Sequence, residues 1–222
     1  MLGLFAVFIP AAYLLGSVPF GVLIAKAHGK DLRAIGSGNI GATNVSRALG
    51  RKWAYVCFFL DVLKGMAPML ATLIAAAALS VPVDDRGPAF LWLWLAVGCA
   101  AILGHIFPVY LKFKGGKGVA TSLGVALGLW PWFTVSAFLA FAVWVTFVLI
   151  WRYVSLASLA AAVAFPLILI LTIALVPQWR FAALWPLLIA ATAIPLMVVI
   201  RHRQNIKRLL AGTESKIGKD KP

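Results

Sequence analysis

The 222-residue sequence has little charge and few acidic side chains. Charged residues make up 12% of it, Asp and Glu together number 6, and hydrophobic residues reach 63%. A soluble domain is typically about 45–50% apolar and about 25% charged, so this composition excludes a soluble globular protein. The same apolar fraction excludes a disordered chain. A polytopic membrane protein is the class that remains.

Cysteine and metal-ligand patterns are missing as well. The only cysteines, Cys57 and Cys99, lie in apolar stretches, so no disulfide framework is expected. No His, Cys and carboxylate residues cluster at metal-ligand spacing, and we expect neither a metal nor another cofactor. No charged side chain precedes Lys26. The N-terminus therefore lacks the basic region of a signal peptide and is expected to be a retained membrane helix.

Uncharged runs divide the chain into membrane spans, since a span needs roughly 20 residues at a rise of 1.5 Å each. The run 118–151 is too long for one upright helix, and Pro131 between two tryptophans predicts a turn in its middle. The other expected spans cover residues 1–25, about 53–83, 87–111, 153–179 and 181–200.

The distribution of Lys and Arg decides between six and seven helices. If 118–151 forms two helices, 17 of the 20 basic residues lie on one membrane face, as the positive-inside rule requires. We therefore expect an all-α, polytopic integral membrane protein. It would form a single domain over residues 1–222, with seven transmembrane helices, the N-terminus outside and the C-terminus cytoplasmic. The fourth helix, about 117–130, is short, and the polar last ten residues are expected to be mobile.

Three cytoplasmic segments, 26–52, 112–117 and 201–222, hold the polar motifs. These motifs are GSGNIGATNV from Gly36, KGGKGVAT from Lys114 and HRQNIKRLLAGTE from His202. Glycines let backbone N–H groups approach an anion, while Ser, Thr and Asn add neutral donors and Lys and Arg add charge. Two such glycine-rich cradles on one face predict a ligand with one or two phosphates. The net charge of +14 is accordingly attributed to basic cytoplasmic loops, and no nucleic-acid partner is expected.

Two stretches match nucleotide-binding motifs in part of their residue pattern but lack the features that those motifs need. The stretch 36–41 reads G-x-G-x-x-G, but membrane helices flank it instead of a βαβ unit. The stretch 115–118 lacks the Ser or Thr that follows the lysine of a P-loop.

The segments GSGNIGATNV, GHIFPVYLKFKGGKGVAT and NIKRLLAGTE, with DVLKG at 61–65 and RYVS at 152–155, resemble the conserved segments of the bacterial acyl-phosphate:glycerol-3-phosphate acyltransferases, the PlsY family. The resemblance covers nearly the whole chain. It implies an inner-membrane enzyme whose active site faces the cytoplasm. It also implies transfer of a fatty acyl group from acyl phosphate to the 1-hydroxyl of sn-glycerol 3-phosphate. The products would be lysophosphatidic acid and phosphate, in the first acylation of phospholipid synthesis. Membrane lipid is the expected surrounding, and no obligate protein partner is indicated.

The resemblance further implies roles for single residues. Lys117, Ser37 and Arg47 are the candidate catalytic residues. Glycerol 3-phosphate would be held by Arg47, Lys117, Ser155, His202 and Asn205. The acyl-phosphate head group would be held by Ser37, Gly38, Asn39, Gly41, Thr43, Asn44, Gly115, Gly116, Lys117 and Gly118.

Other polar residues are expected to be structural. Asp61 and Lys64 stand three apart on one helix and can pair, and Glu214 is expected to tie the basic tail to the cytoplasmic face. His105 either contacts substrate or packs near a helix end. No cytoplasmic cysteine and no H-x-x-x-x-D motif is present, so single-step transfer is expected, with the donor phosphate taking the hydroxyl proton. A nucleophilic Ser37 lacks an evident His–Asp partner.

Three rival functions compete with this reading. A transporter or channel for a phosphorylated solute would use glycine-rich helix ends as its anion site, but the polar motifs gather at one face and no inverted repeat is visible. A noncatalytic scaffold would bind anionic lipid through its basic loops. A lipid transferase of another kind would use acyl-CoA or a CDP-alcohol, but the acidic cluster of the latter class is absent.

Overall fold

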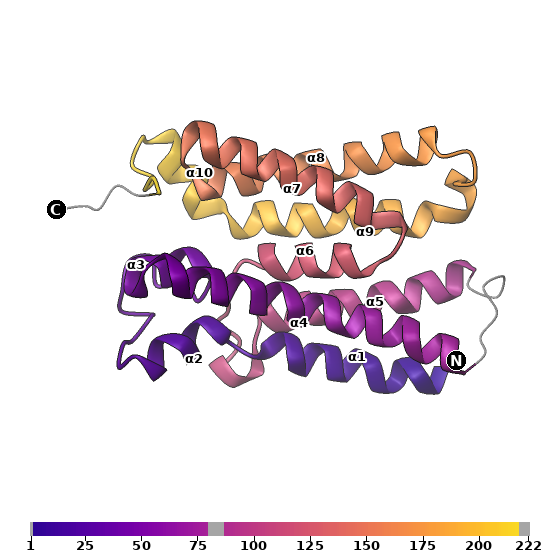
Figure 1. Ribbon diagram of the computed structural model, residues 1–222, viewed down its shortest axis with the longest axis horizontal. Coiled ribbons are helices and arrows are strands. Elements are labelled where there is room, and N and C mark those ends of the chain that lie inside the picture. Colours follow the sequence, from indigo (N-terminus) through magenta and orange to yellow (C-terminus); the bar gives the residue numbers. More distant parts are fainter. Residues whose placement is uncertain (1, 80–86, 218–222) are drawn as a thin grey trace. The chain divides into compact units, whose positions relative to one another are not determined.

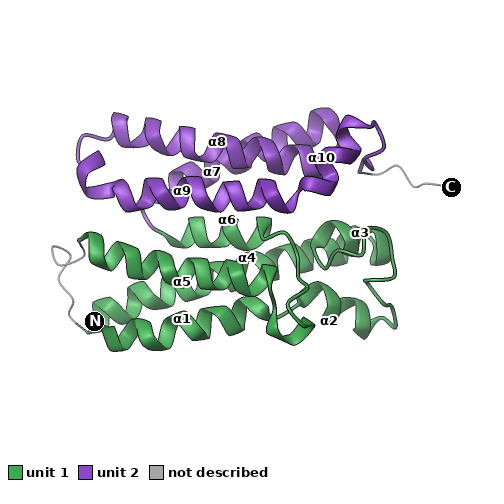
Figure 2. Cartoon of the chain, turned by 180° about the vertical axis from the view of Figure 1, so that it is seen from behind, with its two compact units in different colours: residues 1–129 green, residues 130–222 purple. Residues whose placement is uncertain are grey.

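A computed structural model describes residues 2–79 and 87–217, and nearly all of that part is helical (Figure 1). The chain forms two compact units, residues 1–129 and 130–222 (Figure 2). The end of the second expected span and the basic residue at 86 lie outside the described residues. The expectation of a single domain over residues 1–222 stays a prediction.

The first unit is built from long apolar helices and short polar ones. Its elements are α1 (Leu2–Ser17), α2 (Phe20–Ala27), α3 (Ala42–Leu49), α4 (Arg51–Ala78), α5 (Pro88–Ile106), the 3-10 turn η1 (Val109–Leu111) and α6 (Val119–Gly128). The sequence predicts one helix over 1–25, but the structure breaks it between α1 and α2. Pro19 lacks a backbone N–H and disfavours a helical residue before it, and it stands at this break.

Reciprocal glycine contacts hold these helices together. A Cβ on Gly16 would strike the carbonyl oxygen of Ala101, and one on Gly104 would strike that of Tyr13, so α1 and α5 lie backbone to backbone. Helices α4 and α6 meet in the same way, with Gly65 and Gly124 against the backbone carbonyls of the other helix. Small residues permit this close approach between membrane helices. The glycines thereby fix the ends of α5 and α6, which carry the second polar motif.

The second unit holds α7 (Trp132–Trp151), α8 (Val154–Leu175), α9 (Phe181–Arg201) and α10 (Arg203–Leu210). Only Arg152 and Tyr153 separate α7 from α8, so these two helices run antiparallel side by side. Ring packing joins them at Phe133 and Phe165, whose centroids are 5.1 Å apart. The Trp144 indole also donates to the Ser158 hydroxyl at 3.2 Å.

Six of the described helical stretches are long and apolar enough to cross a membrane, and α6 is shorter, with 10 residues. The split of 118–151 into two helices is confirmed, because α6 ends at Gly128 and α7 begins at Trp132. A 10-residue helix is about 15 Å long and a bilayer core is about 30 Å thick, so α6 is shorter than a full span. The count of seven spans stays a prediction, as does the orientation of the termini.

Candidate active site

The first polar motif is a loop held from within by Asn44. The buried Asn44 side chain accepts hydrogen bonds from the Ser37 backbone N–H at 3.0 Å and the Ser37 hydroxyl at 3.3 Å. Its amide nitrogen donates to the carbonyls of Leu32 and Ile35 at 2.9 and 3.0 Å. Asn44 thus has its polar atoms committed to the loop. This arrangement fits a residue that shapes the loop more than one that touches a ligand.

Glycines let this loop fold tightly around Asn44. Gly36 and Gly38 have φ of 58° and 66°, in the left-handed region that favours glycine. A Cβ on Gly36 would lie 2.6 Å from the Asn44 side-chain oxygen and 3.0 Å from Cδ of Arg47. Asn39 closes the next turn by accepting from the Gly41 N–H at 2.9 Å. Ser37, Thr43 and Arg47, by contrast, are exposed and available to a ligand.

A buried apolar cluster packs beneath the loop. Ala25 of α2, Leu32, Val45 and Ala48 of α3 and Cys57 of α4 are buried together. The cluster joins the three helices that flank the loop, which explains why so polar a segment keeps a defined conformation.

The second polar motif is clasped onto the end of α5. The N–H groups of Gly115 and Gly116 donate to the carbonyls of Ile106 and His105 at 3.1 and 3.0 Å. These two carbonyls belong to the last turn of α5, where the helix itself supplies no partner. Gly118 follows with a φ of 84° and caps the N-terminus of α6. Half-buried Lys117 therefore lies between the turn that is hydrogen-bonded to α5 and the N-terminus of α6, where an anion can bind.

Arg33 joins the two motifs. Its guanidinium donates to the Lys114 carbonyl at 2.6 Å, across 81 positions of sequence. The sequence does not indicate this role, since nothing distinguishes Arg33 from the other basic residues of its segment. The structure thus brings into one unit the residues of both motifs that the sequence predicts to hold the acyl phosphate.

The third motif gathers around Glu214 in the second unit. Ser155 and Asn205 both donate to Oε1 of Glu214, at 2.7 and 2.6 Å, and Arg208 donates to Oε2 at 2.6 Å. The tail continues to Ile217, whose N–H donates to the Arg152 carbonyl at 2.8 Å. The expectation of mobility over the last ten residues is therefore wrong for 213–217, because hydrogen bonds fix this stretch. Residues 218–222 lie outside the described residues.

Opposing effects act on the Glu214 carboxyl group. Burial raises its pKa, while hydrogen bonds from Asn205, Ser155 and Arg208, with the charge of Arg208, lower it. The hydrogen bonds prevail and hold the pKa below its usual range, so Glu214 is an anion at neutral pH. Ser155 and Asn205, two residues predicted at glycerol 3-phosphate, are thus oriented by this anion.

His202 lies beside this cluster at the junction of α9 and α10. Its ring is buried, and Nδ1 is 2.8 Å from the Val198 carbonyl. A carbonyl oxygen only accepts, so Nδ1 carries the hydrogen and the tautomer is set. Ser155, His202 and Asn205 come together in the second unit, whereas Arg47 and Lys117 belong to the first.

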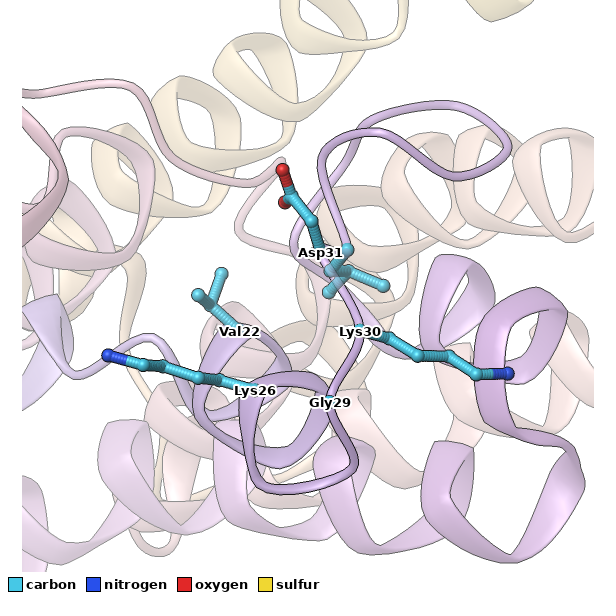
Figure 3. Close-up of a pocket in the computed structure, with 6 residues that line it drawn as sticks. Val22, Lys26, Gly29, Lys30 and Asp31 are labelled. Carbon is cyan, nitrogen blue, oxygen red and sulfur yellow. The ribbon is translucent and has the colours of Figure 1, made fainter.

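A shallow hollow of about 340 Å³ at the end of α2 is a separate feature (Figure 3). Lys26 and Lys30 line it and extend in opposite directions in Figure 3. The Lys30 ammonium donates to the Ala48 carbonyl. None of the predicted site residues lines the hollow, which is lined by Val22, Lys26, Gly29, Lys30, Asp31 and Leu32.

The family model and the relatives that match this chain are named glycerol-3-phosphate acyltransferase. A family model described as glycerol-3-phosphate acyltransferase matches residues 6–212. Glycerol-3-phosphate acyltransferases of Geotalea daltonii and Aquifex aeolicus are each 46% identical to the chain. The matches cover 94% of the chain and 95% of the first relative, and 91% of the chain and 94% of the second.

Two solved structures of a glycerol 3-phosphate acyltransferase also match this chain. The crystal structure of PlsY, an integral membrane glycerol 3-phosphate acyltransferase, in its glycerol 3-phosphate form has a TM-score of 0.80 and 42% identity, over 96% of both chains. Its lysophosphatidic acid form has a TM-score of 0.78 at the same 42% identity, over 96% of this chain and 95% of that one. With a family model matched over 6–212 and relatives 46% identical over nearly their whole length, the chain belongs to the glycerol-3-phosphate acyltransferase family and is an integral membrane enzyme of phospholipid synthesis.

Proposed function

We propose that this acyltransferase takes its fatty acyl group from an acyl phosphate. The observation that carries the proposal is the joining of two glycine-rich loops in one unit through Arg33 and the Lys114 carbonyl. Ser37 lies in the first loop and Arg47 on α3, the helix that follows it, while Lys117 lies in the second loop. Paired anion cradles suit a reaction in which donor and acceptor each bring a phosphate.

The transfer takes place in a single step. The 1-hydroxyl oxygen of glycerol 3-phosphate attacks the carbonyl carbon of the acyl phosphate, and a new ester C–O bond forms. The bond between that carbon and the bridging oxygen breaks, and inorganic phosphate leaves with the hydroxyl proton. Lys117 and Arg47 neutralise the charge that collects on the phosphates. The main task of the enzyme is then to align two substrates, because the donor is already activated.

The acceptor is glycerol 3-phosphate. Of the residues that the sequence assigns to it, Arg47 and Lys117 belong to the first unit, and Ser155, His202 and Asn205 belong to the second. The glycerol 3-phosphate and lysophosphatidic acid forms of the related enzyme support this acceptor and this product. Family membership also favours an acyltransferase over the transporter that the sequence leaves open.

The active site faces the cytoplasm. Arg33 brings the basic segments 26–52 and 112–117 together in the first unit. In the second unit, the bond from Ile217 to Arg152 places the basic tail beside the α7–α8 turn. Apart from Lys64 and Arg180, the basic residues that the structure describes thus collect at one end of each unit, and the positive-inside rule makes that end cytoplasmic.

A donor assay tests the proposal. The purified enzyme is given glycerol 3-phosphate with either palmitoyl phosphate or palmitoyl-CoA, and phosphate release and lysophosphatidic acid are measured together. We expect product from palmitoyl phosphate, with one phosphate released per product. Product from palmitoyl-CoA alone would contradict the proposal.

Isotope exchange separates the single step from an acyl-Ser37 intermediate. Without glycerol 3-phosphate, a covalent intermediate would return its acyl group to labelled phosphate and label the palmitoyl phosphate. We expect no such exchange. Rapid exchange that disappears in Ser37→Ala would establish the covalent route.

A further inference from the structure

The mechanism leaves one buried cluster of the first unit without a role. Asp61 and Lys64 of α4 form an ion pair with 2.7 Å between Oδ1 and Nζ, and both side chains are almost fully buried. His105 of α5 is also buried, and its Nδ1 lies 3.7 Å from the same Asp61 oxygen. Burying charges in a membrane helix is expensive, and well-packed apolar residues often stabilise a fold as well or better. The cluster therefore calls for an explanation beyond packing.

The ion pair is anchored on three sides. The Lys64 ammonium donates to the Val18 carbonyl at 2.8 Å, in the break between α1 and α2. It also lies 5.6 Å from the ring centroid of Phe20, the first residue of α2. Asp61 in turn approaches Cys57, at 3.8 Å between Sγ and Oδ2. The pair thus ties α4 to the start of α2, which leads into the first polar motif.

His105 carries this anchoring to the second motif. Its Nδ1 faces Asp61, while its Nε2 occupies the space that a Cβ on Gly116 would need. Two ring carbons, Cε1 and Cδ2, would lie only 2.9 and 3.0 Å from that Cβ. The backbone adds a second contact, from the Gly116 N–H to the His105 carbonyl at 3.0 Å. The imidazole therefore stands between the buried carboxylate and the residue that precedes Lys117.

We infer that His105 is a positioning residue for the loop 115–118: the buried Asp61–Lys64 pair holds its ring, and the ring sets Gly116 and hence Lys117. This inference rests on the proposed function, in which Lys117 acts on the substrate phosphates. Of the two roles that the sequence leaves open for His105, the geometry selects packing against the loop. A positioning role also explains the charges. At 3.7 Å from Nδ1 the Asp61 oxygen is beyond hydrogen-bond distance, but its charge still favours a ring orientation with an N–H toward it, which an apolar neighbour would not do.

A rescue experiment in the full-length enzyme tests the inference. His105→Ala, Gly116→Ala and the double variant are assayed for kcat and KM, with far-UV circular dichroism as the check of folding. A methyl group on Gly116 would overlap the imidazole, so Gly116→Ala alone is expected to lower kcat by about 10-fold or more, as loss of alignment in an active site does. Removing the imidazole makes room for the methyl group. The double variant should therefore exceed Gly116→Ala in kcat, which independent effects would not allow.

Gly118→Ala is the matched control. Its Cβ would meet Ile106 and Ile102, not the imidazole, and its φ of 84° strains any side chain, so His105→Ala should not relieve it. His28→Ala, at an exposed histidine outside the motifs, should leave kcat unchanged. If His105→Ala loses its helical signal, His105→Asn takes its place, because the shorter amide keeps a donor near Asp61 and vacates the same space.

Three results would overturn the inference: full activity of His105→Ala, a double variant no better than Gly116→Ala, or equal relief of Gly118→Ala. The identity of the acyl donor does not affect this test, because the kcat values of all variants are measured with the donor that the unaltered enzyme uses. Activity with palmitoyl-CoA alone would refute the acyl-phosphate proposal while the rescue pattern still decided the role of His105.

Discussion

At the residue scale, Glu214 shows how one anion organises several polar side chains. It accepts from Ser155, Asn205 and Arg208 although its side chain is only 6% exposed. Hydrogen bonds to a charged acceptor are stronger than neutral ones, and a buried donor left without its acceptor is costly. Glu214 therefore stabilises the tail and orients two residues proposed to bind glycerol 3-phosphate.

Replacing Glu214 by Gln should lower stability at pH 7 by about 1–3 kcal/mol, because three donors lose a charged acceptor. The pKa of Glu214 is lower in the folded state than its ordinary 4.5. Its stabilisation is thus complete above that ordinary value and is lost as pH falls through the folded pKa. Thermal unfolding followed from pH 7 to pH 3 should show a shallower acid dependence in Glu214→Gln. Asp31→Asn, at an exposed carboxylate, is the control, and an equal effect there would contradict the account.

The buried Asp61–Lys64 pair makes a second prediction. Lys64→Met leaves the Asp61 carboxylate without its ammonium and should lower the free energy of unfolding by about 3–5 kcal/mol. The double variant Asp61→Asn, Lys64→Gln removes both charges and should lower it by less. Denaturation in detergent compares them, with Lys52→Met on the exposed first turn of α4 as control, expected within about 0.5 kcal/mol. A double variant as unstable as Lys64→Met would contradict the explanation that the unpaired Asp61 carboxylate causes the loss of stability.

The sequence alone predicts the roles of some of these residues but not of others. The i, i+3 spacing of Asp61 and Lys64 predicts their pairing, because it depends only on helix geometry. Asn44 looks like one more phosphate donor in the sequence, and only the folded loop shows its amide committed to Ser37, Leu32 and Ile35. The Arg33 bond to Lys114 depends on how two distant loops approach, which no local pattern encodes.

At the element scale, glycine pairs decide how closely the helices pack. Gly16 and Gly104 bring α1 against α5, and Gly65 and Gly124 bring α4 against α6. Close approach of backbones also allows Cα–H contacts with carbonyl oxygens, which contribute modestly. These crossings hold the end of α5 and the start of α6, between which Lys117 lies.

A single helix offers a matched test of this packing. Gly16→Ala places a methyl group against the Ala101 carbonyl, whereas Gly3→Ala, also on α1, meets nothing within 4 Å. Overpacking of this kind typically destabilises by about 1–3 kcal/mol, so Gly16→Ala should unfold earlier and Gly3→Ala should not. Equal thermal midpoints for the two variants would show that the crossing tolerates separation.

The helices themselves are largely predictable, because apolar runs and charge boundaries reflect the membrane directly. The division of 118–151 follows from its length and Pro131. The break at Val18 does not follow from the charge pattern, because an uncharged run continues through it, and only Pro19 marks it in the sequence. The polar composition of the tail predicts mobility, yet in its described part Glu214 and Ile217 make hydrogen bonds to distant residues.

At the scale of the whole molecule, the account predicts which ends of the helices face the cytoplasm. Lys207 of α10 and Gln178 of the α8–α9 turn lie at opposite ends of α9. A cysteine introduced at 207 should react with a membrane-impermeant maleimide only in inside-out vesicles, and one at 178 only in right-side-out vesicles. The unaltered chain sets the background, since its Cys57 and Cys99 lie within apolar helices. The reverse labelling pattern would place the site on the other face.

The most direct test of the central claim is the kcat/KM of Lys117 variants with palmitoyl phosphate and glycerol 3-phosphate. Loss of a group that stabilises developing charge typically lowers the rate by about 100- to 1,000-fold, and we expect that loss in Lys117→Ala. Lys117→Arg should also be severely impaired, because Arg differs in reach and geometry. Lys52→Ala removes the same charge as Lys117→Ala but from an exposed lysine, and it should keep nearly full activity. A mildly affected Lys117→Arg would instead mean that the loop supplies only positive charge, and it would contradict the account.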